Sequence, residues 1–307
     1  MNNIVFFGAG SIGSLFAARL VAHYPELNIS LIARKDHVDA ISKNGLRIVG
    51  KSDITVDVAA FDSIKNLGSK IDVMFLCVKN YQTKEAISQF KKYLSDDCVI
   101  VSLQNGLSHL EILKQSLKDQ QIIVGVTSHG AQKKQPGLID HTGVGFTAIG
   151  NLINTSKKNL SWVCQVLSRS GIQTSIEDSI EEVLWKKAII NSSINPITAF
   201  LEVKNGNLLE NPLLKNLVSA LCFESTTLAQ LKGFDIDFDL ALNKTFEVIC
   251  QTKQNKSSML QCVVNKKRTE IESINGVFVS VAESMGSEAA LNSLFVNLIK
   301  EKTKDFS

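Results

Sequence analysis

The first half of the chain alternates short apolar runs with amphipathic ones. Five runs rich in valine and isoleucine, bounded by turn residues, are predicted strands: residues 3–7, 28–33, 72–78, 98–103 and 121–126. Helical patterns separate several of them, at residues 12–24, 83–94 and 108–118. Apolar strands that alternate with helices are typical of a parallel sheet covered on both faces. A glycine-rich, alternating stretch at residues 137–150 predicts a hairpin on the edge of that sheet.

After about Asp178 the pattern becomes helical and stays so to the C-terminus. The predicted helices cover residues 181–194, 211–233, 239–250 and 288–302. We therefore expect an α/β fold in two domains: a parallel-sheet domain over residues 1–177 and an all-helical domain over residues 178–307.

A glycine motif directly follows the first predicted strand and opens the first helix. In GAGSIG, Gly8 permits a tight turn, Gly10 lets the backbone approach a pyrophosphate, and Gly13 allows close packing of helix and strand. The pyrophosphate would sit at the helix N-terminus, where free N–H groups and the helix dipole favour an anion. Strand, turn, helix and second strand follow in order, so the motif predicts a dinucleotide-binding domain of the Rossmann type.

The end of the second strand distinguishes between the two nicotinamide cofactors. An NAD site normally has an acidic residue there, which binds the ribose 2′-hydroxyl. This chain has Arg34 at that place, followed by Lys35. A guanidinium suits a 2′-phosphate, so the sequence favours NADPH.

Two further polar stretches follow strands at the same carboxyl edge of the sheet. Lys79 and Gln82 follow the strand at residues 72–78, and Asn105 and Gly106 follow the next. Ordinary turn chemistry explains each pair taken alone. Together on one edge they indicate a cofactor cleft.

A largely apolar segment, WKKAIINSSINPITAF, contains a row of polar side chains. A helix advances about 100° per residue, so Lys187, Asn191 and Asn195 fall within an arc of roughly 80°. Such a row could hold a polar ligand or form a stripe wetted by solvent. Pro196 is expected to end or kink this helix.

Composition narrows the class of protein. A net charge of +3 is too small to argue for a nucleic-acid or anionic-membrane partner. The six cysteines form no CxxC pair and no histidines cluster near them, so reduced thiols fit better than disulfides or a metal site. The apolar N-terminal run lacks the preceding basic residues of a signal peptide. We expect a soluble, cytoplasmic protein without a membrane partner.

These residues resemble a known family. GAGSIGS, LIAR, VKNYQT, LQNG, WKKAIINSSINPITAF, KNGNLL, KSSMLQ and TEIESINGVF occur in the order and approximate spacing of ketopantoate reductases, also called 2-dehydropantoate 2-reductases. The resemblance runs from residue 4 to about residue 290. It implies a Rossmann domain, a helical C-terminal domain and an active site between them. It also implies reduction of ketopantoate to pantoate with NADPH, in the pathway to pantothenate and coenzyme A.

The resemblance also implies roles for individual residues. Lys187 would be the catalytic lysine, Glu270 would lie where nicotinamide and substrate meet, and Asn105 would touch both ligands. The substrate would be bound by Asn191, Asn195, Asn205 and Ser258. The cofactor would be bound by Gly8, Ala9, Gly10, Ser11, Ile12, Gly13, Arg34, Lys79, Gln82 and Ala131.

Two other functions remain compatible with the sequence. One is a reductase of a different small 2-oxo acid, because pocket size is not readable from sequence and small pocket differences discriminate by only about 1–3 kcal/mol. The other is a cofactor-binding sensor without catalysis, against which Lys187 and its neighbours argue. The oligomeric state stays open, a homodimer being one compatible assembly.

Overall fold

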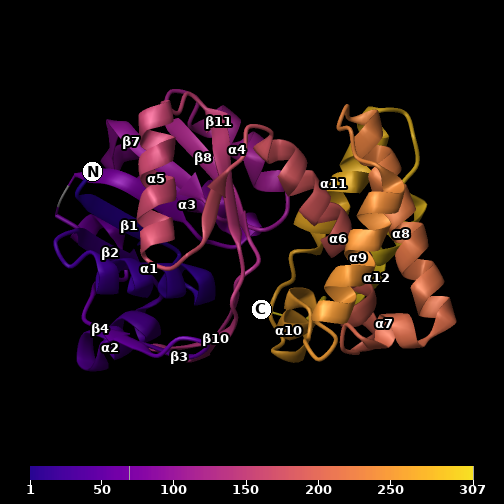
Figure 1. The fold of residues 1–307 in the computed structure, drawn as a ribbon, viewed down its shortest axis with the longest axis horizontal. Coiled ribbons are helices and arrows are strands. Elements are labelled where there is room, and N and C mark those ends of the chain that lie inside the picture. Colours follow the sequence, from indigo (N-terminus) through magenta and orange to yellow (C-terminus); the bar gives the residue numbers. More distant parts are fainter. Residues whose placement is uncertain (69, 307) are drawn as a thin grey trace. The chain divides into compact units, whose positions relative to one another are not determined.

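The computed structural model describes residues 1–68 and 70–306 of the chain (Figure 1). It divides into two compact units. The first comprises Met1–Gln104 and His109–Glu181, and the second comprises Asn105–Ser108 and Glu182–Ser307. None of the described helices combines the length and apolar character needed to cross a lipid bilayer.

The first unit is built on an eight-stranded sheet in the order β12-β11-β8-β7-β6-β1-β2-β5. All neighbouring strands pair in parallel except β8 and β11. The strand bounds are β1 Asn3–Phe7, β2 Asn28–Ile32, β5 Ala59–Phe61, β6 Ile71–Leu76, β7 Leu94–Ser102, β8 Gln121–Thr127, β11 Thr147–Ile153 and β12 Thr174–Ile176. The five predicted strands correspond to β1, β2, β6, β7 and β8, and the predicted parallel α/β architecture is confirmed.

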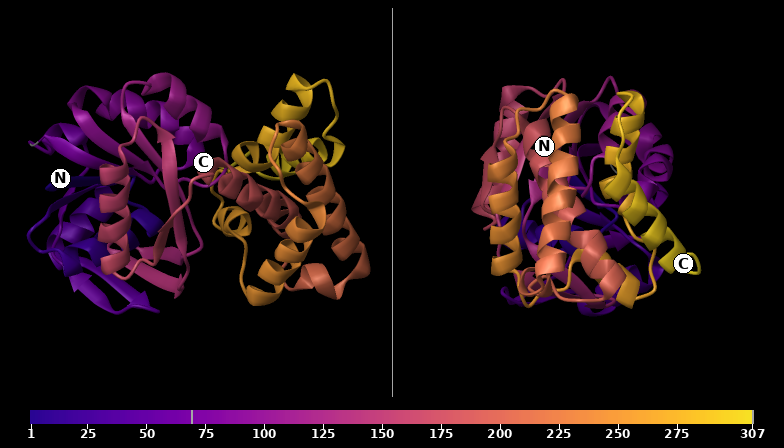
Figure 2. Two further views of the ribbon diagram at one scale, coloured as in Figure 1. Left: turned by 45° about the horizontal axis from the view of Figure 1, so that its top comes forward. Right: turned by 90° about the vertical axis from the view of Figure 1, so that its right-hand side faces the viewer.

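Helices cover both faces of this sheet. Their bounds are α1 Ser11–His23, α2 Lys35–Asn44, α3 Thr83–Phe90, α4 Ser108–Ser116 and α5 Lys157–Arg169. α1 and α5 pack together on one face of the sheet. α3 and α4 connect β6, β7 and β8, where the chain moves along the sheet in the direction opposite to that from β1 to β2, and they cover the other face (Figure 2). Short 3₁₀ turns lie at Ile64–Asn66, Asn80–Gln82 and Lys91–Tyr93.

A second sheet, which the sequence analysis missed, covers the outer side of α1. It has the order β4-β3-β10-β9, with bounds β3 Leu46–Gly50, β4 Ile54–Val56, β9 Gly130–Gln135 and β10 Leu138–Gly143. α1 contacts strands of both sheets and is therefore enclosed between them.

The prediction of a hairpin over residues 137–150 is wrong. β10 pairs with β9 and β3 in the second sheet, whereas β11 pairs with β8 and β12 in the first. The connection between them crosses from one sheet to the other, and at Gly145 a β-carbon would overlap the backbone of Ser128. Alternating apolar residues suit a partner strand in either sheet, so the pattern did not identify the partner.

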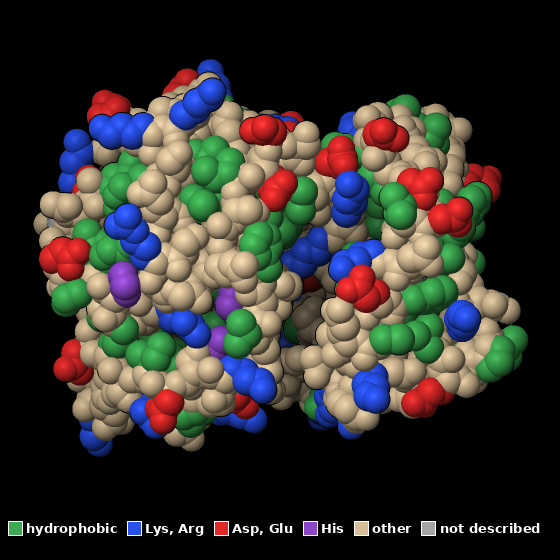
Figure 3. Space-filling model, viewed as in Figure 1, with side chains coloured by type: hydrophobic (Ala, Val, Ile, Leu, Met, Phe, Trp, Pro, Cys, Tyr) green, Lys and Arg blue, Asp and Glu red, His purple; other side chains and the backbone are tan. Residues whose placement is uncertain are grey.

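The second unit is all-helical. Its helices are α6 Ile180–Leu201, α7 Asn207–Glu210, α8 Pro212–Leu231, α9 Phe238–Gln251, α10 Ser258–Val264, α11 Ile271–Ser284 and α12 Ala290–Lys302. The long helices α8 and α9 run side by side (Figures 1 and 2). Acidic and basic side chains are interspersed over the face of the molecule drawn in Figure 3.

Of the two outcomes expected at Pro196, an end or a kink of the helix, the first does not occur, because α6 continues past this residue. Proline has no N–H to donate to the carbonyl of Ser192, four residues earlier. That carbonyl instead accepts a hydrogen bond from Asn275 Nδ2 on α11, at 3.1 Å. A buried side chain thus replaces the missing backbone donor, and the helix runs on to Leu201.

Candidate functional site

The glycine turn between β1 and α1 has the backbone that the motif requires. Gly8 has φ +80°, a left-handed conformation, and a β-carbon there would lie 2.8 Å from the backbone nitrogen of Val78. The N–H groups of Gly8 and Ala9 both donate to the carbonyl of Ile32, at 2.9 and 3.0 Å. The turn is therefore fixed to the ends of β2 and β6.

The start of α1 presents free donors beside an open backbone. The N–H groups of Ser11, Ile12 and Gly13 have no hydrogen-bond partner among residues 1–68 and 70–306. A β-carbon on Gly10 would meet nothing closer than the Gly8 carbonyl oxygen at 3.8 Å, so this side of the turn is open. Free N–H groups at a helix N-terminus suit a diphosphate, and the turn fits a dinucleotide.

Three predicted cofactor residues follow β2 and β6, the two strands that flank β1 in the sheet. β1 lies between β2 and β6, so the residues after these three strands share one edge. Arg34 directly precedes α2, is exposed, and has no ion pair within the described part of the chain. Lys79 and Gln82 follow β6 and are partly buried, with the Gln82 N–H donating to the Lys79 carbonyl at 2.8 Å.

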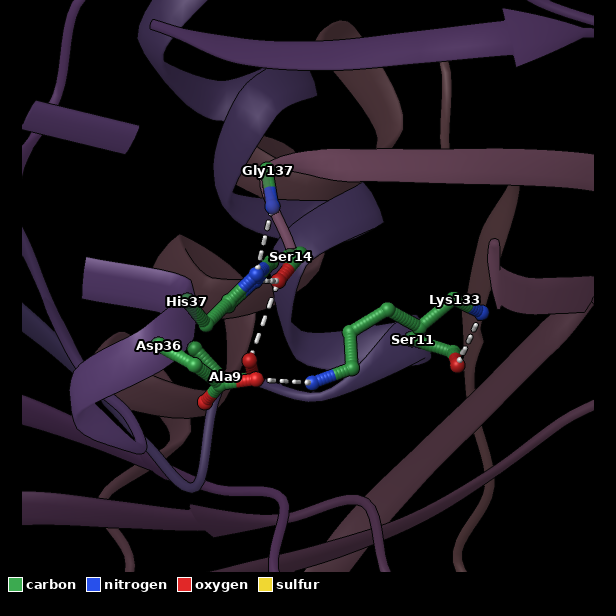
Figure 4. A network of polar contacts seen from close by, with 7 residues as sticks. All are labelled: Ala9, Ser11, Ser14, Asp36, His37, Lys133 and Gly137. Atoms are coloured by element: carbon green, nitrogen blue, oxygen red, sulfur yellow. Dashed lines mark hydrogen bonds and ion pairs between the residues drawn. The ribbon is translucent and has the colours of Figure 1, made fainter. Parts of the chain in front are cut away.

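A buried histidine connects this turn with the second sheet (Figure 4). His37 Nδ1 accepts from the Gly137 N–H at 2.9 Å, and its Nε2 lies 3.1 Å from Ser14 Oγ. Ser14 Oγ donates to the Ala9 carbonyl at 3.1 Å. Burial, with Lys133 as a lesser cause, lowers the pKa of His37 to about 4, so the ring is neutral at pH 7. The sequence analysis missed His37, because a single histidine at the start of a helix gives no signal of its burial.

Ala131 lies in β9 opposite His141 and packs against the core of the first unit. Two residues further along the same strand, the Lys133 N–H donates to Ser11 Oγ at 3.0 Å. β9, the strand of Ala131, therefore touches the first residue of α1.

The predicted catalytic lysine is held in the second unit. Lys187 Nζ on α6 donates to Asn105 Oδ1 at 2.9 Å, although 82 residues separate them. Burial lowers the pKa of Lys187 to about 8, and the negative charge of Glu270 partly opposes that shift. Glu270 directly precedes α11, and only 7% of its surface is exposed. The structure thus brings together three of the predicted site residues.

The loop that carries Asn105 is anchored on α11. Gly106 has φ +77°, and a β-carbon there would overlap the carbonyl oxygen of Ser273. The Leu107 N–H donates to the same carbonyl at 3.1 Å. This close backbone contact fixes Asn105 beside Lys187.

The polar row on α6 continues from Lys187 as expected. Asn191 is partly buried, and Asn195 is 5% exposed, with its Nδ2 3.5 Å from Ser258 Oγ. Ser258 is exposed, whereas its neighbour Ser257 is buried and accepts from the Leu260 N–H at 3.1 Å and from Thr198 Oγ1 at 2.7 Å. The two serines therefore differ in their surroundings, and only Ser258 is accessible to a ligand.

Asn205 is hydrogen-bonded to two residues that follow α9, Thr252 and Asn255. Its Nδ2 donates to Thr252 Oγ1 at 2.9 Å, and its backbone N–H donates to the Asn255 carbonyl at 3.1 Å. Its buried Oδ1 has no partner within the described residues. The structure thus shows a role for Asn205 in the turn before α7, and its assignment to substrate stays a prediction.

Three histidines outside the predicted site are buried: His109, His129 and His141. Burial lowers the pKa of His109 to about 3 and that of His129 to about 4. Burial also lowers the pKa of His141. At pH 7 these rings are neutral.

Comparison with known proteins covers both units. Residues 4–154 match the family described as ketopantoate reductase PanE/ApbA, and residues 179–303 match its C-terminal domain. A 2-dehydropantoate 2-reductase of Pyrococcus horikoshii is 36% identical over 300 residues, 97% of each chain. The solved PanE/ApbA family ketopantoate reductase of Ralstonia eutropha is 25% identical, with a TM-score of 0.88 over 98% of each chain.

A third relative shares the fold. D-mandelate dehydrogenase, solved with NADH and anilino(oxo)acetate, is 22% identical, with a TM-score of 0.90 over 98% of each chain. Both family matches and the 36% identity over nearly the whole length agree with the glycine turn and the lysine site. The chain belongs to the ketopantoate reductase PanE/ApbA family.

Proposed function

We propose that this protein is an NADPH-dependent 2-dehydropantoate 2-reductase, which reduces ketopantoate to (R)-pantoate in the pathway to pantothenate and coenzyme A. The observation that carries the proposal is the Lys187 ammonium, 2.9 Å from Asn105 and close to the charge of Glu270. Family membership and the relatives named 2-dehydropantoate 2-reductase support the substrate.

Lys187 acts on the oxygen of the substrate ketone. Bound NADPH supplies the hydride that the ketone carbon receives. Negative charge then develops on the carbonyl oxygen, where the ammonium stabilises it and donates a proton. With a pKa of about 8, about nine tenths of Lys187 is protonated at pH 7, and the proton is still more easily released than from an ordinary lysine.

Neutral polar groups orient the substrate around this lysine. Asn191, Asn195 and Asn205 supply amides without a competing charge, and the Ser258 hydroxyl donates to the substrate carboxylate. Asn195 and Ser258 lie side by side, which supports their joint role.

The cofactor is held at the glycine turn. The turn formed by Gly8, Ala9, Gly10, Ser11, Ile12 and Gly13 binds the diphosphate, and the free N–H groups of Ser11, Ile12 and Gly13 at the start of α1 are its donors. Arg34 binds the 2′-phosphate, Lys79, Gln82 and Ala131 line the rest of the cofactor, and Asn105 and Glu270 contact it near the substrate. The guanidinium of Arg34, which is exposed and has no ion pair within residues 1–68 and 70–306, supports NADPH over NADH.

The first test follows NADPH oxidation with ketopantoate, beside pyruvate and 2-oxoisovalerate, with NADH as the parallel cofactor. We expect rapid oxidation with ketopantoate and NADPH only. Tight NADPH binding without turnover of any of these acids would contradict the proposal and favour a non-catalytic sensor.

The second test removes the ammonium. Lys187→Ala is expected to lower turnover by about 10²-fold or more and to leave NADPH affinity nearly unchanged. Lys186→Ala is the matched control, because Lys186 is exposed and paired with Glu182 at 2.6 Å. Comparable loss of activity in both variants would refute the role of Lys187.

A second candidate function is reduction of another small 2-oxo acid. The TM-score of 0.90 with D-mandelate dehydrogenase favours it as the alternative, because this fold then accommodates a different acid. Oxidation of NADPH with pyruvate or 2-oxoisovalerate in place of ketopantoate would select this candidate.

The proposal includes a homodimer in the cytoplasm. Leu213, Phe223 and Leu240 on α8 and α9 are 77%, 57% and 71% exposed, which supports a contact between two copies. None of the six cysteines, all of which lie in the described part of the chain, forms a disulfide, which supports a reducing compartment. Light scattering at micromolar concentration tests the first point, and cell fractionation the second.

A further inference from the structure

We propose that Lys133 is a second cation for the 2′-phosphate of NADPH and determines, with Arg34, the preference for NADPH over NADH. The inference rests on the proposed NADPH-dependent function and extends it to a residue that neither the sequence analysis nor the motif identified. It stands on where β9 places the lysine and on the charges around it (Figure 4).

The backbone of Lys133 is fixed at the start of the phosphate-binding helix. Its N–H donates to Ser11 Oγ at 3.0 Å. From there the side chain, 28% exposed, extends past the turn, so that its ammonium lies 3.9 Å from Asp36 Oδ2 (Figure 4). The ammonium therefore lies at the first turn of α2, beside Asp36, which lies two residues after Arg34.

The contact with Asp36 leaves the ammonium able to bind a ligand. A separation of 3.9 Å exceeds hydrogen-bond distance, so the three N–H donors of Lys133 are not used by this carboxylate. Lys35 is engaged elsewhere, with Asp39 at 3.1 Å along the exposed side of α2. Lys133 is thus better placed than Lys35 to assist Arg34.

Two contacts fix β9 and α2 relative to each other. The Gly137 N–H, in the turn between β9 and β10, donates to His37 Nδ1 at 2.9 Å. A β-carbon on Gly137 would lie 3.2 Å from Cβ of Ala40, so the turn packs directly on α2. Because His37 has a pKa of about 4, this tie persists over the usual assay range. The backbone positions that carry Lys133 and Arg34 are therefore held together without a ligand.

The charge balance explains why a second cation is needed. A 2′-phosphate carries a charge near −2 at pH 7. Arg34 offers one positive charge, but Asp36 offsets it at the same turn of α2. Lys133 restores a net positive charge there. An NADH ribose, which has a hydroxyl instead, gains little from it.

The experiment measures binding of two cofactor fragments by calorimetry: 2′,5′-ADP, which carries the 2′-phosphate, and 5′-AMP, which lacks it. For Lys133→Ala we expect about a tenfold loss of affinity for 2′,5′-ADP and less than a twofold change for 5′-AMP. The ratio of KM values for NADPH and NADH should move by a similar factor. Lys133→Arg should retain most of the affinity.

Lys134→Ala is the matched control. Consecutive residues of a strand point to opposite faces, and Lys134 pairs with Asp140 at 3.2 Å instead. Equal losses for both fragments in Lys133→Ala would overturn the inference and leave Lys133 a structural role. Equal effects of Lys133→Ala and Lys134→Ala would also overturn it, by showing a general surface charge. Failure of the wild-type protein to prefer 2′,5′-ADP would instead refute NADPH as the cofactor, so the two failures are distinguishable.

Discussion

The charge of Glu270 should set the alkaline limit of activity. The ordinary pKa of lysine is 10.5, burial lowers that of Lys187 to about 8, and Glu270 raises it against that trend. In Glu270→Gln the opposing charge is gone, so the pKa of Lys187 must fall further. Because the ammonium is the active form, the alkaline limb of the kcat profile should move to lower pH.

The size of the effect follows from the protonated fraction. A pKa of about 8 leaves about nine tenths of Lys187 protonated at pH 7. Each unit of displacement corresponds to about 1.4 kcal/mol, and a single unit would leave about half of the lysine protonated at pH 7. Turnover at pH 7 would then fall about twofold and recover toward pH 6.

The assay is kcat against pH with both substrates saturating, for the wild type, Glu270→Gln and a control. Glu272→Gln is that control, since Glu272 lies on the same helix but is half-exposed and paired with Lys300 and Arg268. Its limb should coincide with that of the wild type. A limb in Glu270→Gln that stays in place, or moves to higher pH, would refute the coupling of Glu270 to Lys187.

Two further changes test the framework around the site. Gly106→Ala would force a left-handed backbone and a clash with Ser273, which should cost about 2 kcal/mol or more in the free energy of unfolding and lower kcat as Asn105 leaves Lys187. Thermal unfolding and turnover check this, and a stable, fully active variant would contradict it. Ser257→Ala removes a helix cap and should cost about 1–2 kcal/mol of stability with little change in KM, whereas Ser258→Ala should raise KM for the 2-oxo acid and change stability by less than about 0.5 kcal/mol. A reversal of these two results would exchange the roles of the serines.

Features that depend only on neighbouring residues could be predicted from the sequence. The glycine turn formed as predicted because Gly8 needs positive φ and the first turn of any helix leaves N–H groups free. The polar row from Lys187 to Asn195 lies on one helix because its spacing is that of a helix. The domain boundary at residue 177 falls between β12 and α6 and stays a prediction.

Contacts between residues that are distant in the sequence could not be predicted in the same way. The apolar alternation around residues 138–153 suited two strands but did not show that they join different sheets. Pro196 predicted an end or a kink of the helix, because nothing nearby in sequence shows that Asn275 donates to the freed carbonyl of Ser192. Ser257 and Ser258 are chemically identical neighbours, and only packing on α6 separates their roles.

Fold class, cofactor turn and family were thus predictable from the chain alone, because they depend on periodicity, glycine conformation and motifs read along it. The surroundings of the reactive groups depend on contacts between residues that are far apart in the chain. Asn105 and Glu270 are distant from Lys187 in sequence but lie close to it in the folded chain. Burial of Lys187, which its residue type does not reveal, lowers its pKa to about 8. Lys133 reaches the start of α2 only because β9 crosses the phosphate-binding helix, and pairing between distant strands is a property of the folded chain.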